Sequence, residues 1–233
     1  TRSFHVTGVQ TCALPIWDFN TLQQRIVGYN VADLNFGSST ASAVTLSFWV
    51  RSSLTGTFGV GLSNSAQDRS VASTYTINSA NTWEQKTITF SGDQSGTWIT
   101  NNGIGLIVNF DLGSGTTSNA TTAGTWQAGR VLRTSACTNF IGTTGATWYI
   151  TGVQLERGST ASSFEYRPYG TELALCQRYY ETSAAYIPDS ASLPTNWWYK
   201  TSMRATPTVT VSGAGGTTFG GSTEQIEIGR AHV

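Results

Sequence analysis

The sequence predicts an all-β protein: a jelly-roll β-sandwich followed by a short helix and a small, truncated β unit. Residues 44–51 and 104–112 alternate apolar and polar side chains, the two-residue period of a strand with one buried side. Clusters of Gly, Ser, Thr and Asn separate these and similar stretches at short intervals, as turns do in sandwiches. Within residues 148–155, Trp148 and Ile150 on one side and Tyr149, Thr151, Val153 and Leu155 on the other are aromatic, β-branched or apolar, which is typical of a strand covered within two layers.

The other strands follow from the same pattern. In chain order the sequence predicts an entry pair of strands within 17–30, with 24–27 as its best segment. Further strands are predicted at 44–51, 56–63, 71–77, 83–90, 104–112, 126–134, 136–141 and 148–155. Strict alternation in the last strand points Trp148 and Ile150 to one side and Val153 and Leu155 to the other. Residues 113–125 form a low-complexity loop that is too long for a simple hairpin.

A helical period follows the sandwich. Thr171 can cap a helix, and Leu173, Cys176 and Tyr180 follow at helical spacing. We therefore expect a helix at 171–181 that packs as a lid or linker against a sheet.

The last part of the chain predicts a second, incomplete β unit. Its strands are expected at 197–200 and 208–211, and the Gly-rich stretch 213–221 interrupts it. The predicted organisation is a foreign segment, a jelly roll, a helical linker, the C-terminal β unit and a second foreign segment, at residues 1–16, 17–167, 168–181, 182–226 and 227–233.

The two foreign segments resemble translated sequencing adapter at 6–16 and 227–233. Residues 11–16 can be encoded ACGTGTGCTCTTCCGATC, and the reverse complement of that DNA encodes residues 228–232 in a shifted frame. Protein ends related by DNA complementarity have no protein-level cause, so both segments are excluded from the fold prediction.

Composition excludes several classes of partner. Without Arg2, Glu227 and Arg230 the chain keeps 11 basic and 12 acidic residues, which provides no electrostatic footprint for nucleic acid or an anionic membrane. No apolar run approaches membrane-spanning length. Cys137 and Cys176 are expected to be separate buried thiols, and their spacing fits no zinc site.

Catalysis is not expected. Both histidines, His5 and His232, lie in the excluded segments, which removes a Ser-His-Asp or Cys-His nucleophile. The remaining candidate acids lie on separate strands and turns without a pairing signal. They are Glu84, Asp93, Asp111 and Glu156.

Five residues form the main candidate for a sugar-binding site. Pyranose rings stack on aromatic side chains, and planar polar groups bind their hydroxyls. Alternation places Trp49, Arg51, Gln85, Asn109 and Asp111 opposite the apolar stripes, where neighbouring strands would gather them into one patch. The alternative is structural: a loop or partner subunit covers Trp49, and Arg51 pairs with Asp111.

Three other tryptophans complete the candidate set. Trp98 and Trp126 lie beside loops, where they serve either as platforms at the rim of a sugar site or as packing at the edge of the core. Trp83 is expected in the core.

Several segments together resemble bacteriophage tail-fibre and other virion structural proteins, with a first part similar to carbohydrate-binding jelly-roll modules. They are FWVRSS (48–53), NTWEQKTITF (81–90), SGTW (95–98), YITGVQLERGS (149–159) and FEYRPYGTELALCQRYYE (164–181). The resemblance implies a non-catalytic module in an extracellular virion fibre that binds host-surface glycan and assembles with sister chains as a trimer. Two alternatives stay open: a purely structural virion module, or the ancillary sugar-binding domain of a secreted bacterial carbohydrate-active enzyme.

The resemblance also bears on cofactors. No cofactor is expected, except that jelly rolls of this kind commonly hold a structural calcium ion. Oxygen-rich residues at 64–68 or Asp111 would supply ligands, although turn capping explains the same residues and the metal site stays unassigned.

Overall fold

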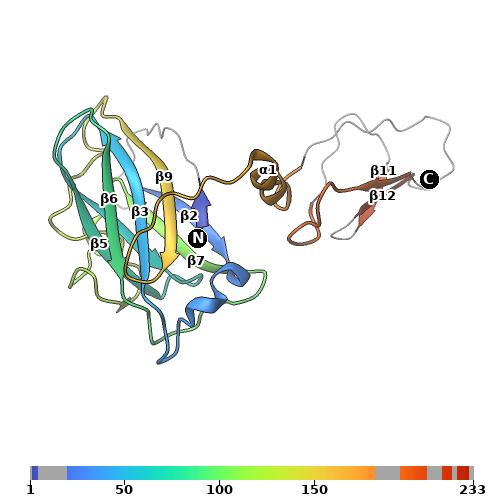
Figure 1. Cartoon of the computed structure of the whole chain (residues 1–233), viewed down its shortest axis with the longest axis horizontal. Helices are drawn as coiled ribbons and strands as arrows, with labels where there is room; N and C mark the ends of the chain where they lie inside the picture. Colours follow the sequence, from blue (N-terminus) through green and yellow to red (C-terminus); the bar gives the residue numbers. More distant parts are fainter. Residues whose placement is uncertain (1, 5–19, 182–194, 209–216, 222–224, 231–233) are drawn as a thin grey trace. The chain divides into compact units, whose positions relative to one another are not determined.

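The structure is a computed structural model that describes the backbone at residues 2–4, 20–181, 195–208, 217–221 and 225–230 (Figure 1). Its side chains are described at 20–181 and 198–208. The chain divides into two compact units, Thr1–Glu165 and Tyr166–Val233.

The first unit is a sandwich of two antiparallel sheets, which confirms the predicted all-β sandwich. Sheet A has the order β1 (Arg2–Phe4), β9 (Trp148–Arg157), β3 (Val44–Ser52) and β6 (Glu84–Phe90). Sheet B has the order β2 (Thr21–Val27), β7 (Ile104–Asp111), β4 (Gly56–Ser63), β5 (Arg69–Ile77) and β8 (Gln127–Ala128). Figure 1 shows β6, β3 and β9 of sheet A side by side.

Aromatic side chains from both sheets fill the space between the layers. Phe48 of sheet A meets the rings of Tyr75 and Phe110 of sheet B edge-on, each at 5.1 Å between centroids. The indole N–H of Trp148 donates to the Tyr75 hydroxyl at 3.2 Å, so these two buried polar groups are paired with each other. Burial raises the pKa of Tyr75 far above its ordinary value, which keeps the phenol neutral.

The strong strand predictions are confirmed and the weak ones are wrong. The strands expected at 44–51, 56–63 and 104–112 are β3, β4 and β7. Of the strands expected at 126–134 and 136–141, only the two residues of β8 form one. Backbone hydrogen bonds connect the rest of that segment to loops and strand ends instead. The amides of Leu132, Thr138 and Ile141 donate to the carbonyls of Ser118, Thr57 and Leu112, respectively. The amide of Ala120 donates to the carbonyl of Arg133.

The chain before β3 also differs from the expectation. Its described part forms one strand, β2, and then two short 3-10 turns, η1 (Gly28–Asn30) and η2 (Ala32–Leu34). Another 3-10 turn, η3 (Thr116–Ser118), lies in the long loop after β7.

A β-bulge in β9 corrects the predicted alternation. The register with β3 shifts between Ser47 and Trp49, opposite Gly152, whose φ of 58° favours glycine. The inserted residue turns the rest of the strand over. Ile150 and Val153 therefore both face the core, and the next polar residues lie on the outer face.

Strands also form within both segments that the fold prediction excluded. Arg2–Phe4 pairs antiparallel with β9 at Val153–Leu155, and β12 (Gln225–Arg230) extends into the C-terminal segment. Pairing at a sheet edge needs only main-chain N–H and C=O groups, so it does not depend on the origin of the sequence.

The second unit holds α1 (Tyr169–Gln177) and a sheet of order β10 (Thr195–Trp198), β12 and β11 (Thr217–Gly221). The helix begins two residues before the expected start and ends four before the expected end, and none of its residues is buried. Leu173 and Cys176 are exposed, so the predicted packing of this side and the buried Cys176 thiol are wrong. The strand expected at 208–211 lies largely outside the described residues.

The sequence of α1 gives one reason why none of its residues is buried. Leu173 and Leu175 are two residues apart and so lie on opposite sides of the helix, which leaves no single apolar stripe to bury. In the part of the chain that the structure describes, no helix is both long and apolar enough to cross a membrane.

Candidate ligand-binding surface

The structure divides the predicted sugar-binding patch between the two sheets. Trp49 and Arg51 lie on β3, and Gln85 pairs with Trp49 from the neighbouring strand β6. Asn109 and Asp111 lie on β7 in sheet B, the opposite layer of the sandwich. The prediction of one patch is therefore wrong, because alternation gives the side of a strand but not the sheet to which it belongs.

Asn109 and Asp111 are both about 1% exposed and serve the fold. Asn109 accepts from Gln23 at 2.8 Å, and its own amide group donates to Ser63 at 3.3 Å. The backbone N–H of Ser114 donates to Asp111 at 2.8 Å. Neither side chain can reach a ligand without removal of the loop that covers this face of sheet B.

The cation beside Asp111 is Arg133, not Arg51. The Nη1 atom of Arg133 lies 3.8 Å from Oδ2 of Asp111, and the same guanidinium donates to the carbonyls of Ser114 and Cys137. Burial raises the pKa of Asp111 despite these partners. The expected Arg51–Asp111 pair is wrong, because the two residues lie in different sheets. Arg133 lies in the stretch predicted as a strand at 126–134, and that pattern gave no signal for its pairing with Asp111.

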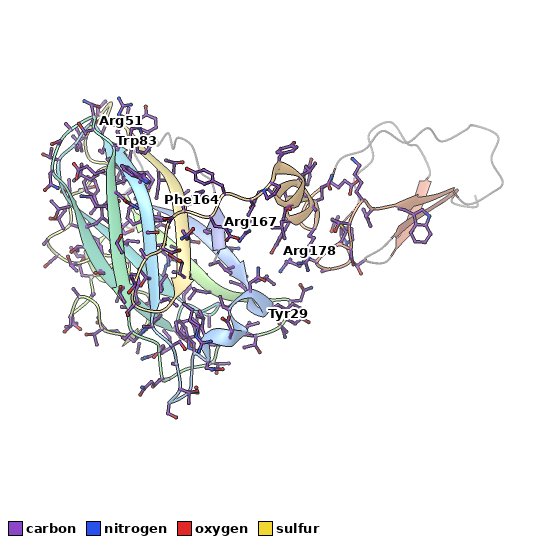
Figure 2. The ribbon with its side chains drawn as sticks, viewed as in Figure 1. Tyr29, Arg51, Trp83, Phe164, Arg167 and Arg178 are labelled. Atoms are coloured by element: carbon purple, nitrogen blue, oxygen red, sulfur yellow. The ribbon has the colours of Figure 1, made fainter. Side chains whose placement is uncertain are left out.

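An exposed group of aromatic residues instead covers one end of the outer face of sheet A. Trp49 and Trp83 are each 41% exposed, and Tyr149 is 36% exposed. Trp83 directly precedes β6 beside Arg51, as Figure 2 shows, so the expectation that it lies in the core is wrong. We call this surface the aromatic patch; its residues are Trp49, Arg51, Trp83, Gln85, Tyr149, Thr151 and Phe164.

Strand register holds the patch together. Trp49 pairs with Gln85 on one side and Thr151 on the other, and Arg51 pairs with Tyr149. Three adjacent strands make the patch about 10 Å wide. Because Phe48 and Val50 are fully buried beside Trp49, the backbone under the patch is anchored in the core.

The bulge glycine keeps the middle of the patch open. A Cβ atom at Gly152 would lie 3.3 Å from Cδ1 of Trp49 and 3.8 Å from Cδ2 of Phe164. Both rings therefore lie close to the bulge, in the space that a side chain at this position would enter. Phe164 was not among the candidate site residues predicted from the sequence.

Residues 158–165, which we call the strap, cover the other end of the same face. Gln154 and Glu156 of β9 point outward yet are 0% and 9% exposed, because the strap lies over them. The strap donates the Glu165 amide to Gln154 at 2.8 Å and the Ser162 amide to Glu156 at 2.9 Å. The strap thus covers one end of the face and contributes Phe164 to the aromatic patch at the other.

Trp98 and Trp126 form an aromatic cluster with Phe36 at the edge of the core. Their centroids lie 5.4 Å apart at 90°, and Phe36 lies 4.8 Å from Trp98. Each indole N–H donates to a backbone carbonyl, Trp98 to Ser95 at 3.0 Å and Trp126 to Ser91 at 2.7 Å. Core-edge packing, the structural alternative for this pair, accounts for both residues.

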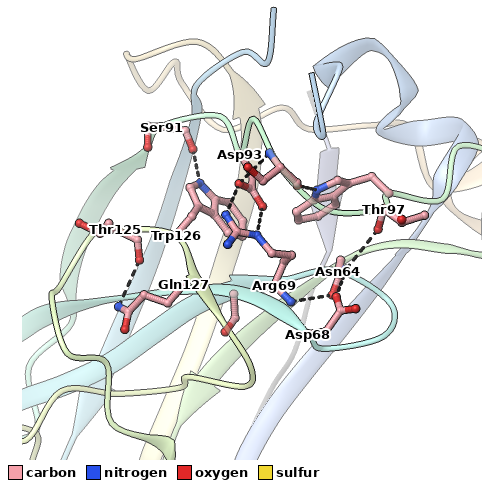
Figure 3. Close-up of polar contacts among 12 residues, drawn as sticks. Asn64, Asp68, Arg69, Ser91, Asp93, Thr97, Thr125, Trp126 and Gln127 are labelled. Carbon is pink, nitrogen blue, oxygen red and sulfur yellow. Dashed lines mark hydrogen bonds and ion pairs between the residues drawn. The ribbon is translucent and has the colours of Figure 1, made fainter. Parts of the chain in front are cut away.

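An ion pair with a buried carboxylate holds the loop that carries Trp98 (Figure 3). Asp93, 2% exposed, accepts from Nε of Arg69 at 2.9 Å and from its Nη2 at 2.5 Å. The two parallel bonds are the bidentate geometry that guanidinium and carboxylate favour. They connect β5 of sheet B to the turn after β6.

Each of the four candidate acids has its own separate environment. Glu84 accepts from the amides of Asn78 and Ser79, each at 2.8 Å, and from Lys86 at 2.6 Å. These bonds, that from Lys86 above all, lower the pKa of Glu84 to about 2.

The residues expected to hold calcium do not fit a cation. Asn64 directs its amide N–H toward Asp68 Oδ1 at 2.6 Å, and Arg133 already supplies positive charge beside Asp111. Within the described ranges, no group of three or more His, Cys, Asp or Glu residues could hold a metal ion. Structural calcium stays a prediction.

Comparisons with known proteins add little to this geometry. No protein-family model matches the chain, and no curated protein matches it. A solved structure entitled "CBM4 structure and function" is similar at 16% identity and a TM-score of 0.35, covering 66% of this chain and 77% of that one. The class of the protein is an all-β sandwich, and this rests on the strand pairing described above.

Proposed function

We propose that the sandwich is a non-catalytic sugar-binding module and that the aromatic patch is its binding surface. The observation that carries the proposal is the exposure of Trp49, Trp83 and Tyr149 on adjacent strands with a rigid core beneath them. Exposed apolar area gathered in one place marks binding sites, whereas scattered exposed residues do not.

The chemistry of the patch suits a sugar. The rings offer flat surfaces for the apolar faces of pyranoses, and Gln85, Thr151 and Arg51 supply amide, hydroxyl and guanidinium groups for hydroxyls. Binding without reaction is also supported by the acids. Glu84 and Glu156 each have their own hydrogen-bond donors and do not face each other across a cleft.

A glycan array probed with the full chain tests this function. Trp49→Ala should weaken binding by about five- to thirtyfold, the effect of losing a central aromatic contact. The matched control is Tyr29→Ala, because Tyr29 is 64% exposed and lies on η1 outside the patch. Equal binding by both variants, with folding verified by circular dichroism, would rule out the patch as the site.

The setting we propose is the tail fibre of a bacteriophage, where the module would bind host-surface glycan outside the cell. Support for this setting comes from the sequence segments alone, including the stretch at 164–181. The genes adjoining the full-length gene discriminate this setting from an ancillary domain of a secreted carbohydrate-active enzyme.

A second candidate function is structural, with the patch buried against a sister chain in a trimeric fibre. The same exposed aromatic residues favour it, because such residues are also enriched in protein interfaces. Sedimentation of the full chain discriminates the two. A stable trimer whose Trp49 and Trp83 fluorescence resists acrylamide quenching would support the structural function, and a monomer would support sugar binding.

A further inference from the structure

Arg51 leaves a specific chemical demand in the aromatic patch, and the inference drawn from it rests on the proposed function. Its guanidinium carbon lies 5.6 Å from the centroid of the Tyr149 ring. Its Nε atom is enclosed and has no hydrogen-bond partner among the described residues. A guanidinium has five N–H donors and no acceptor, so any ligand group that bonds to Arg51 must be an acceptor.

The terminal nitrogens of Arg51 remain available to a ligand. Of its three nitrogens, only Nε counts among the enclosed atoms that lack a partner, and no described residue forms an ion pair with Arg51. The pair of Nη groups forms a planar fork whose spacing matches the two oxygens of a carboxylate. Contact with the Tyr149 ring stabilises the cation and orients that fork.

Arg51 has no acidic counter-ion in the aromatic patch. The aromatic patch contains no acidic residue, and the two glutamates on the strands that flank β3 are already satisfied. Glu84 is bonded to Lys86, and Glu156 lies under the strap with Ser162. In partly desolvated surroundings, a cation without a counter-ion attracts an anionic group more strongly than it would in water.

We infer that the aromatic patch binds an acidic glycan, and that Arg51 pairs with the carboxylate of a uronic acid in it. The rings of Trp49 and Trp83 take the sugar faces, while Arg51 selects for the charge. A neutral hydroxyl can accept from only part of the fork, so a carboxylate fits better than any neutral sugar substituent.

The probes that test this inference are polygalacturonate, polymannuronate and glucuronan, each beside its carboxyl-reduced counterpart. Within each pair only the carboxylate changes. In whichever pair binds, the wild-type chain should prefer the acidic member by about ten- to a hundredfold. That preference should weaken as salt increases, because an exposed ion pair is screened.

Arg51→Gln should remove the preference, because it should weaken binding of the acidic member much more than binding of the neutral member. The control is Arg157→Gln, since Arg157 is exposed at the far end of β9 and donates to Ser42. Equal affinity for both members of the bound pairs, or binding of dextran sulfate in place of the uronates, would overturn the inference and leave sugar binding standing. Absence of binding to every glycan would contradict the proposed function itself.

Discussion

Replacing Glu156 by Gln tests whether the strap is part of the folded sandwich. Glu156 is 9% exposed, and its two oxygens accept from the amide and the hydroxyl of Ser162. A hydrogen bond to a charged group contributes about 1.5–3 kcal/mol. Because Gln keeps one of the two acceptors, Glu156→Gln should lower the free energy of unfolding by about 1–2 kcal/mol at pH 7.

The pKa of Glu156 predicts how the stability difference between Glu156→Gln and wild type changes with pH. Burial alone would raise the pKa of Glu156, but hydrogen bonds from Ser162 and Gln154 outweigh burial and leave the pKa lowered. A carboxylate with a lowered pKa stabilises the fold above its ordinary pKa, and that contribution is lost as the pH falls through the folded-state pKa. The difference between Glu156→Gln and wild type should therefore shrink in acid.

Urea unfolding at several pH values measures this difference, with an unchanged m-value as the check that compactness is preserved. The control is Glu172→Gln on α1, whose partner Arg167 lies 3.3 Å away in an exposed pair expected to contribute less than about 0.5 kcal/mol. A Glu156→Gln variant as stable as wild type at pH 7, or a difference that persists undiminished in acid, would refute the reasoning.

Two further predictions concern the sandwich. Phe48→Ala should lower the free energy of unfolding by about 3–5 kcal/mol in urea, because Phe48 is fully buried against Tyr75 and Phe110; a loss below about 1 kcal/mol would place the core elsewhere. Glu84→Gln should lower stability by about 0.5–1 kcal/mol at neutral pH, and the difference should vanish between pH 4.5 and about 2 as wild-type Glu84 is protonated. Thermal unfolding across that range checks it, and a constant difference would be the contrary result.

The sequence predicted the sandwich because the strand signal is local. Residues such as Val44–Arg51 show which side chains share a face, and a buried face admits only one register. The same signal does not show which strands become neighbours. Asn109 and Asp111 were therefore grouped with Trp49, although a different sheet and a covering loop separate them.

The aromatic patch was predictable only in part. Trp49, Arg51 and Gln85 were recognised from alternation. Tyr149 belongs to a strand that was expected to be covered on both sides, and Phe164 was not among the candidates. The bulge at Gly152 turns Gln154 and Glu156 to the outer face, where the strap covers them, while Tyr149 before the bulge remains exposed. A single inserted residue reverses the alternation after it, and the sequence carries only the glycine as a signal.

The indole N–H signals in a proton–nitrogen correlation spectrum test the central claim most directly. The full chain is titrated with a glycan selected on the array, and the signals are assigned by single Trp→Phe variants. If the outer face of sheet A binds sugar, the signals of Trp49 and Trp83 shift on titration, while those of Trp98 and Trp126 stay in place with their carbonyl partners. Shifts confined to Trp98 and Trp126 would contradict the account.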